Sequence, residues 1–399
     1  MQETWRWYGE ADPITLEHVR QTGAAGVVTA LHEMPDGTSW PAQDIARRKA
    51  MVEAAGLAWA VCESIPMEQC VKRGDGDAPK AIARWKDTLA NLGRAGIPVV
   101  CYNFMPVVDW TRTDLRWRTR RGNGLALRFE MTDFVAYDVF ILKRAGACDD
   151  YDPAIVARAE ARAAAMDEDE KLLLERNIIA GLPGGALMQT RASISALLDS
   201  FKGIDAAAMQ GNLIAFLKEV VPVAEEYGVL LGIHPDDPPF SLFGLPRVVS
   251  TPQDVRNILA SVDSPHNGIT LCTGSYGSRR DNDLAAMARE FAPRINFAHL
   301  RNVTVEADGS FFEDDHLDGG TDMVAVIETL LREERRRAAA GDGRPAIPLR
   351  PDHGHLLGDD IGKKTNPGYS YIGRMKGLGE LRGVIRAIDR QLDREEANA

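Results

Sequence analysis

The chain has 399 residues, of which 45% are hydrophobic, so it is long enough to bury a large core. Its formal net charge of -11 disfavours general binding to nucleic acid or to an anionic membrane, because like charges repel. The longest apolar runs are far shorter than the roughly 18 residues that a transmembrane helix needs. The first residues lack a signal-peptide pattern, and the 5 cysteines have no tight spacing typical of a disulfide framework. We therefore expect a cytoplasmic, globular protein.

Short apolar segments alternate along the chain with amphipathic segments of helical period. The apolar segments are nearly continuous runs, which is typical of parallel strands covered on both faces. Eight such strands separated by helices favour an α/β fold, the (β/α)8 TIM barrel. The alternative is a doubly wound sheet, which would usually have a glycine-rich phosphate turn after its first strand, and this chain lacks that turn. The expected strands are Thr4–Tyr8, Gly26–Leu31, Leu57–Ser64, Pro98–Phe104, Val229–His234, Ile269–Cys272, Ile295–Leu300 and Ile347–Arg350.

The connection between the fourth and fifth expected strands, residues 105–228, is too long to lack structure of its own. Alternating apolar residues around a glycine turn predict a β-hairpin at about 112–130, and helical segments are expected at about 153–179 and 190–201. We expect one domain, residues 1–399, with this insertion acting as a lid or as a subunit interface. Its cluster of arginines is either a solvated or subunit-contact face or a positive rim that steers an anionic substrate. These arginines are Arg112, Arg116, Arg118, Arg120 and Arg121.

Each of the last four expected strands has, at its carboxyl end or within two residues of it, a residue of a type that binds metal ions. In a barrel, the carboxyl ends of the strands form the active face, and adjacent strand ends lie close enough to converge on one ion. Each residue alone has an ordinary explanation, such as core packing for a cysteine. Four of them at corresponding positions indicate a divalent metal site that suits Fe²⁺, Mn²⁺, Co²⁺ or Zn²⁺. The four residues are His234, Cys272, His299 and Asp352.

Other polar residues at the same face could move protons or bind a substrate. His353 follows Asp352 at the end of the eighth strand, and a neutral imidazole is the natural proton carrier near pH 7. The loop beyond it carries Tyr369 and Tyr371, whose phenols either pack or hydrogen-bond a leaving hydroxyl. Three more residues are candidate substrate ligands, with a surface salt bridge as the alternative for the arginine. They are Arg301, Asn103 and His32.

Several long motifs are spread over nearly the whole chain. They are Thr4-Trp-Arg-Trp-Tyr-Gly9, Gly26-Val-Val-Thr-Ala-Leu31, Cys101-Tyr-Asn-Phe-Met-Pro-Val-Val-Asp-Trp-Thr-Arg-Thr-Asp114, Gly232-Ile-His-Pro-Asp-Asp-Pro-Pro239, and Arg350-Pro-Asp-His-Gly-His355 with Asn366-Pro-Gly-Tyr369. Together they resemble the D-mannonate dehydratases of the hexuronate-catabolic type. Motifs of this length are specific, so the resemblance carries more weight than any single residue.

The resemblance has implications for fold, activity and site. It implies a barrel similar to the xylose-isomerase-like barrels, and the dehydration of D-mannonate to 2-dehydro-3-deoxy-D-gluconate with Fe²⁺ or Mn²⁺. It also implies that His353 and Tyr369 are the catalytic pair, in either order of base and acid. We expect a homo-oligomer, with a dimer as the first choice, because the insertion offers a large non-catalytic surface. The positions that match the family's metal ligands are His234, Cys272, His299 and Asp352.

Three other functions have to be distinguished from dehydration. A metal-dependent aldose–ketose isomerase or epimerase on the same barrel also needs a metal and acid–base groups, and only its product differs. A nuclease on such a barrel usually needs several metals and a basic groove, which the net charge of -11 disfavours. A non-catalytic sugar-acid-binding protein would need neither the four-ligand site nor the pair of His353 and Tyr369.

Overall fold

Eight parallel strands form a closed barrel at the centre of the protein. A computed structural model describes residues 1–119, 122, 124–179 and 190–398. The barrel order is β1-β12-β9-β8-β7-β4-β3-β2, with β1 paired to both β12 and β2, which confirms the predicted (β/α)8 fold. Each expected strand overlaps one barrel strand. The barrel strands are β1 (Gln2–Arg6), β2 (Gly26–Thr29), β3 (Ala58–Glu63), β4 (Val99–Tyr102), β7 (Leu230–Ile233), β8 (Asn267–Cys272), β9 (Ile295–His299) and β12 (Pro348–Arg350).

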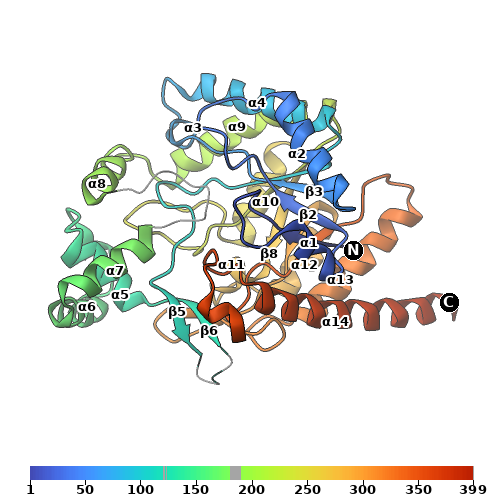
Figure 1. Ribbon diagram of the computed structural model, residues 1–399. Coiled ribbons are helices and arrows are strands. Elements are labelled where there is room, and N and C mark those ends of the chain that lie inside the picture. Colours follow the sequence, from blue (N-terminus) through green and yellow to red (C-terminus); the bar gives the residue numbers. More distant parts are fainter. Residues whose placement is uncertain (120–121, 123, 180–189, 399) are drawn as a thin grey trace.

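Helices surround the barrel and bury its outer face (Figure 1). Their ends follow local signals, as in α10, where the Thr251 side chain accepts from the Asp254 amide and Pro252 occupies the first turn. Among the described residues, none of the helices is both long and apolar enough to cross a membrane. The helix α9 (Ala206–Glu226) ends the insertion. The helices outside the insertion are α1 (Leu16–Gln21), α2 (Ala42–Ala54), α3 (Gln69–Arg73), α4 (Ala78–Arg94), α10 (Pro252–Ser261), α11 (Thr273–Gly277), α12 (Leu284–Phe291), α13 (Met323–Ala339) and α14 (Tyr371–Ala397).

A second, antiparallel sheet lies beside the barrel. β5 (Asp114–Arg118) pairs with β6 (Leu125–Phe129), in the span where the sequence predicts a hairpin. β6 also pairs with β11 (Phe311–Glu313), and β11 pairs with β10 (Val303–Val305). The β10–β11 hairpin follows β9 and was not expected from the sequence. The sheet of order β10-β11-β6-β5 therefore joins the insertion to the loop after the seventh barrel strand.

The remainder of the insertion is helical. The segment expected to be helical at about 153–179 is divided, because the chain turns to an extended conformation at Met166, the C-cap of α6. The last expected helix corresponds to α8. The helical elements are α5 (Met131–Val135), a π-helical turn (Ala136–Ile141), a 3-10 turn (Ala147–Asp150), α6 (Pro153–Ala165), α7 (Glu168–Ile179) and α8 (Arg191–Asp199).

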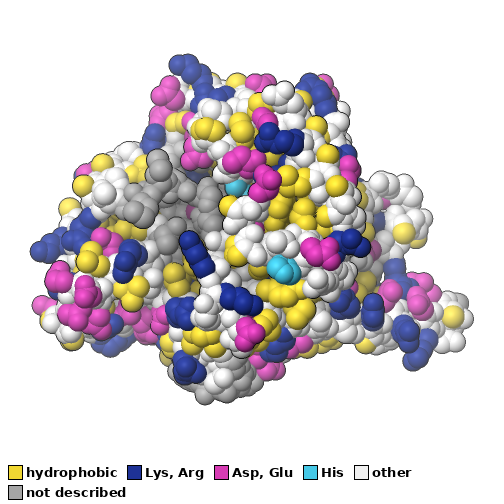
Figure 2. All heavy atoms as spheres, viewed as in Figure 1, with side chains coloured by type: hydrophobic (Ala, Val, Ile, Leu, Met, Phe, Trp, Pro, Cys, Tyr) yellow, Lys and Arg dark blue, Asp and Glu magenta, His cyan; other side chains and the backbone are white. Residues whose placement is uncertain are grey.

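The arginines of the hairpin do not form one surface. Arg112 is 0% exposed, so neither a solvated face nor a steering rim describes it. It is buried because two carboxylates from distant parts of the chain reach it, as described below. Arg116 and Arg118 are exposed, whereas Arg120 and Arg121 lie outside the described residues. On the face shown in Figure 2, basic and acidic side chains are interspersed rather than gathered into one basic band.

Candidate metal centre and active site

Four neighbouring barrel strands bring the predicted ligand residues to one end of the barrel. Cys272 and His299 are the last residues of β8 and β9. His234 follows β7 directly, and Asp352 follows β12 by two residues. Because β7, β8, β9 and β12 are adjacent and parallel, their carboxyl ends lie at the same edge.

The donor atoms of these four side chains face one another. His234 Nε2 lies 3.2 Å from His299 Nδ1, and Asp352 Oδ1 lies 3.7 Å from the same nitrogen. Asp352 Oδ2 lies 3.6 Å from Cys272 Sγ. Ligand atoms that sit about 2.0–2.3 Å from one ion in a tetrahedral arrangement are about 3–4 Å apart. The donor atoms of His234, Cys272 and His299 all lie within 4.8 Å of one another and could hold a metal ion, and Asp352 lies beside this group. Two imidazoles, a thiol and a carboxylate also form a donor set that suits first-row divalent metals.

Asp352 has an unusual backbone conformation, and two arginines hold its carboxylate. Its φ is 60°, a left-handed value that costs a non-glycine residue about 1–3 kcal/mol. Arg350 lies 2.5 Å from Oδ1, and Arg301 Nε lies 3.0 Å from Oδ2. Burial alone would raise the pKa of Asp352, but the Arg350 guanidinium and other nearby cations outweigh it and keep that pKa well below its ordinary value. Asp352 is therefore an ionised carboxylate held in a fixed position, as a candidate ligand requires.

Cys272 is positioned by the short helix that follows it. The Ser275 amide donates to Cys272 Sγ at 3.4 Å, and the two side chains lie 3.0 Å apart. Both contacts keep the sulfur at the strand end, next to Asp352. Cys272 is fully buried, so exchange with solvent thiols is blocked.

A second group of potential ligands, Glu63, Cys101 and His299, lies nearby but is less suited to a metal ion. Glu63 already pairs with Arg350 at 3.0 Å and with Arg6 at 3.1 Å. Burial raises the pKa of Cys101 well above its ordinary value, which disfavours a thiolate. Arg350, which Glu63 holds, donates from Nε to His299 Nε2 at 3.1 Å. We infer that Glu63 acts on the first group of candidate ligands by fixing Arg350, which orients the His299 ring.

A cavity of about 650 Å³ opens onto the candidate metal centre. His353 and Tyr369 both line it, with their rings edge to face and 5.0 Å apart between centroids. Trp110 contacts the His353 ring in the same manner at 5.8 Å. Burial raises the pKa of the Tyr369 phenol, which therefore stays protonated and can donate a hydrogen bond.

The three predicted substrate ligands occupy different positions. His32 and Asn103 line the cavity, and the His32 Nε2 atom is buried without a hydrogen-bond partner in the described structure. Burial and nearby Arg6 lower the pKa of His32 to about 3, so it is a neutral hydrogen-bonding group. Arg301 is not among the described residues that line the cavity. It is 2% exposed and pairs with carboxylates of the protein, among them Asp237 at 2.7 Å.

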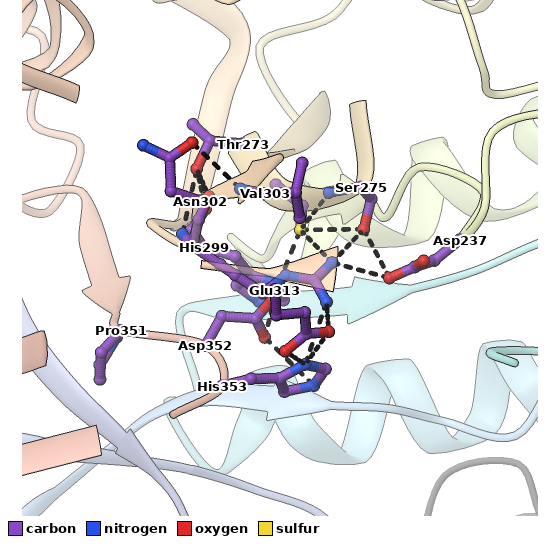
Figure 3. Close-up of polar contacts among 12 residues, drawn as sticks. Asp237, Thr273, Ser275, His299, Asn302, Val303, Glu313, Pro351, Asp352 and His353 are labelled. Carbon is purple, nitrogen blue, oxygen red and sulfur yellow. Dashed lines mark hydrogen bonds and ion pairs between the residues drawn. The ribbon is translucent and has the colours of Figure 1, made fainter. Parts of the chain in front are cut away.

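Arg301 belongs to a buried ionic network that sequence reasoning missed. Arg112 Nη1 and Nη2 contact Asp237 Oδ1 at 2.7 Å and Glu313 Oε1 at 2.9 Å. Arg301 pairs with the same two carboxylates. Glu313 in turn contacts His353, and Figure 3 shows Glu313 and His353 close together with Asp352 beside them. Asp237 lies in a motif quoted above, but no sequence signal marked Glu313, whose strand was not expected.

Fold and site together define a class of protein: an α/β barrel with a candidate divalent-metal centre and acid–base groups at the carboxyl ends of its strands. The chain matches the family described as "D-mannonate dehydratase (UxuA)" over residues 1–395. The chain belongs to this D-mannonate dehydratase family.

Individual relatives agree with the family match. The chain is 80% identical over 399 residues to "Mannonate dehydratase 2" of Agrobacterium fabrum, covering 100% of both chains. It is 54% identical to "Mannonate dehydratase" of Saccharophagus degradans, covering 98% of each. A crystal structure of mannonate dehydratase from Streptococcus suis superposes with a TM-score of 0.77 at 36% identity, covering 98% of this chain and 95% of that one. A xylose isomerase domain protein from Planctomyces limnophilus, with a TM-score of 0.52 and 9% identity, shares the fold alone.

Proposed function

We propose that this protein dehydrates D-mannonate to 2-dehydro-3-deoxy-D-gluconate, using Fe²⁺ or Mn²⁺. The observation that carries the proposal is a group of candidate metal ligands, His234, Cys272 and His299, in a chain of the D-mannonate dehydratase family. A cavity lined by His234, Asp352, His353 and Tyr369 adjoins this group. The proposed ligands are His234, Cys272, His299 and Asp352. When bound, the metal supplies a Lewis acid that polarises the substrate carboxylate.

The protein's own residues carry the proton transfers. His353 takes the proton from C2, the carbon next to the carboxylate, through an imidazole nitrogen. Tyr369 donates its phenolic proton to the hydroxyl on C3, so that the C3–O bond breaks and water leaves. The C2=C3 enol that remains then tautomerises to the 2-keto acid. In this proposal His32 and Asn103 hydrogen-bond substrate hydroxyls, and their place in the cavity lining supports that role.

Product analysis tests the reaction. The protein is purified without oxygen, reloaded with Mn²⁺ or Fe²⁺, and incubated with D-mannonate beside a chelated control. We expect a 2-keto-3-deoxy acid that forms only with metal. An isomerised sugar acid with no loss of water would instead identify an isomerase. Tight mannonate binding by metal-free protein without turnover would identify a binding protein.

We also propose that the chain assembles as a homo-oligomer, with a dimer as the simplest form. Two-fold dimers are the commonest assemblies of soluble proteins. On α7 the adjacent Leu172 and Leu173 are 48% and 52% exposed, which suits a contact surface better than a solvated one. Light scattering after size-exclusion chromatography measures the mass directly, and a monomer across the working concentration range would contradict the proposal.

A further inference from the structure

Glu313 lies in the second sheet, and its carboxylate contacts His353 of the active site. It is the last residue of β11, the strand that pairs with β6 of the insertion and with β10. It is 3% exposed and is not among the described residues that line the cavity. Glu313 is therefore placed to act on the side chains of the active site and not directly on the substrate.

Glu313 makes a two-point contact with His353. Each of its carboxylate oxygens lies 2.9 Å from His353 Nδ1. Arg112 Nη2 donates to Oε1 at 2.9 Å, and Arg301 Nη1 donates to the same oxygen. Burial alone would raise the pKa of Glu313, but Arg301 and its other partners lower it to about 2. The carboxylate is therefore ionised at neutral pH, and two guanidiniums prevent it from rotating.

This contact decides which nitrogen of His353 carries the hydrogen. An ionised carboxylate can only accept hydrogen bonds, so Nδ1 must be the donor. Arg301 Nη1 also lies 3.0 Å from Nδ1, but both groups are donors, and Arg301 donates to Glu313 instead. A neutral His353 with its hydrogen on Nδ1 has its lone pair on Nε2. That nitrogen is 3.9 Å from Asp352 Oδ1, so it faces the candidate metal centre.

We propose that Glu313 is a positioning residue that fixes His353 in the Nδ1–H form and so makes Nε2 the proton acceptor in the dehydration. The proposal rests on the proposed function for the identity of the reaction. In Figure 3 Glu313 and His353 lie against each other, with Asp352 adjacent. When Nε2 takes the proton from C2, the imidazolium keeps its Nδ1–H bond to Glu313, and the paired negative charge stabilises it.

The substitution Glu313→Gln tests the proposal with a clear structural expectation. Arg112 and Arg301 both donate to the Oε1 position, so the amide oxygen of the glutamine will occupy it. The amide NH₂ then occupies the Oε2 position, 2.9 Å from His353 Nδ1, where it can only donate. Because a hydrogen on Nδ1 would oppose the amide hydrogens, we expect the ring hydrogen to move to Nε2. We expect kcat to fall about 100-fold or more, while KM and metal content stay within about twofold.

Glu306→Gln is the matched control. Glu306 belongs to the same hairpin and pairs with Arg128 at 2.6 Å, with no described contact to His353. Its substitution should leave kcat and the His353 ring unchanged. A loss of metal in Glu313→Gln, or a kcat within about threefold of the unsubstituted enzyme, would overturn the proposal.

Nitrogen NMR measures which ring nitrogen of His353 carries the hydrogen, and it does not require turnover. The protein is labelled with ¹⁵N-histidine and loaded with diamagnetic Zn²⁺, and the His353 signals are identified by their loss in His353→Gln. We expect protonated Nδ1 in the unsubstituted protein and protonated Nε2 in Glu313→Gln. Protonated Nε2 in the unsubstituted protein would overturn the proposal even if Glu313→Gln does not fold. If the unsubstituted enzyme forms no keto acid, the proposed function fails, whereas the NMR result still decides the role of Glu313.

Discussion

Lys72 offers a quantitative test of the burial and charge described for this cavity. It lies in α3, is 4% exposed, and its Nζ donates to the Met105 carbonyl at 2.7 Å. Burial lowers its pKa from 10.5 to about 8, with Arg247 adding to the effect and Asp109 opposing it. The folded protein therefore holds an ammonium group that would be more stable in water.

The energetic cost follows from the two pKa values. At about 1.4 kcal/mol for each tenfold change in the acid constant, the difference between 10.5 and about 8 corresponds to about 3 kcal/mol below pH 8. Between pH 8 and 10.5 the unfolded chain keeps a proton that the folded protein has lost, so the cost declines as pH rises. Lys72→Met removes this cost but leaves the Met105 carbonyl without its donor, a loss of about 1 kcal/mol.

We therefore expect Lys72→Met to raise the free energy of unfolding by about 2 kcal/mol at pH 7 and to leave it nearly unchanged at pH 10. Urea denaturation of metal-free protein at both pH values measures the difference. Lys49→Met is the matched control, because Lys49 also donates to a carbonyl at 2.7 Å but has a side chain 33% exposed. It should give no gain at either pH. The reasoning would be refuted if Lys72→Met were less stable than the unsubstituted protein at pH 7. It would also be refuted if the free energy of unfolding changed equally at pH 7 and pH 10.

Two further predictions concern the metal centre and the packing behind it. Cys272→Ser should weaken Mn²⁺ binding by about 100-fold or more, since it replaces a proposed ligand, and titration of metal-free protein measures this; unchanged affinity would exclude Cys272 as a ligand. In α14, Gly377→Ala should lower the free energy of unfolding by about 2 kcal/mol, because its Cβ would lie 2.1 Å from the His316 ring. In Gly379→Ala the new Cβ has no atom within 4 Å, so this control should raise the free energy of unfolding by up to about 1 kcal/mol. Equal changes in the free energy of unfolding of the two variants would contradict the packing at Gly377.

The barrel could be predicted because its strands have a strong local signal. β7, β8 and β9 are buried along their full length, and apolar residues predominate in each of them. The candidate ligands followed from strand ends alone, because a barrel brings all carboxyl ends to one face. Predicting the candidate ligands therefore required no knowledge of tertiary contacts between side chains.

The second sheet and its charges could not be predicted in the same way. β10 and β11 are three residues each, and β11 is held by pairing with β6, in which Phe311 pairs with the distant Phe129. Arg112 looked like one of several surface arginines, but Asp237 and Glu313 bury it. Arg301 was expected at the substrate, yet its partners are protein carboxylates. Such long-range ion pairs leave no periodicity in the sequence.

The most direct test of the proposed site is to measure metal content and turnover in the same preparation of His353→Ala. If His353 moves the proton while other residues bind the metal, the variant and the unsubstituted protein should each bind about one equivalent of Mn²⁺. Its kcat for keto acid formation from D-mannonate should fall about 100-fold or more. A variant that loses its metal, or one that retains its metal and turns over at the original rate, would contradict this division of roles.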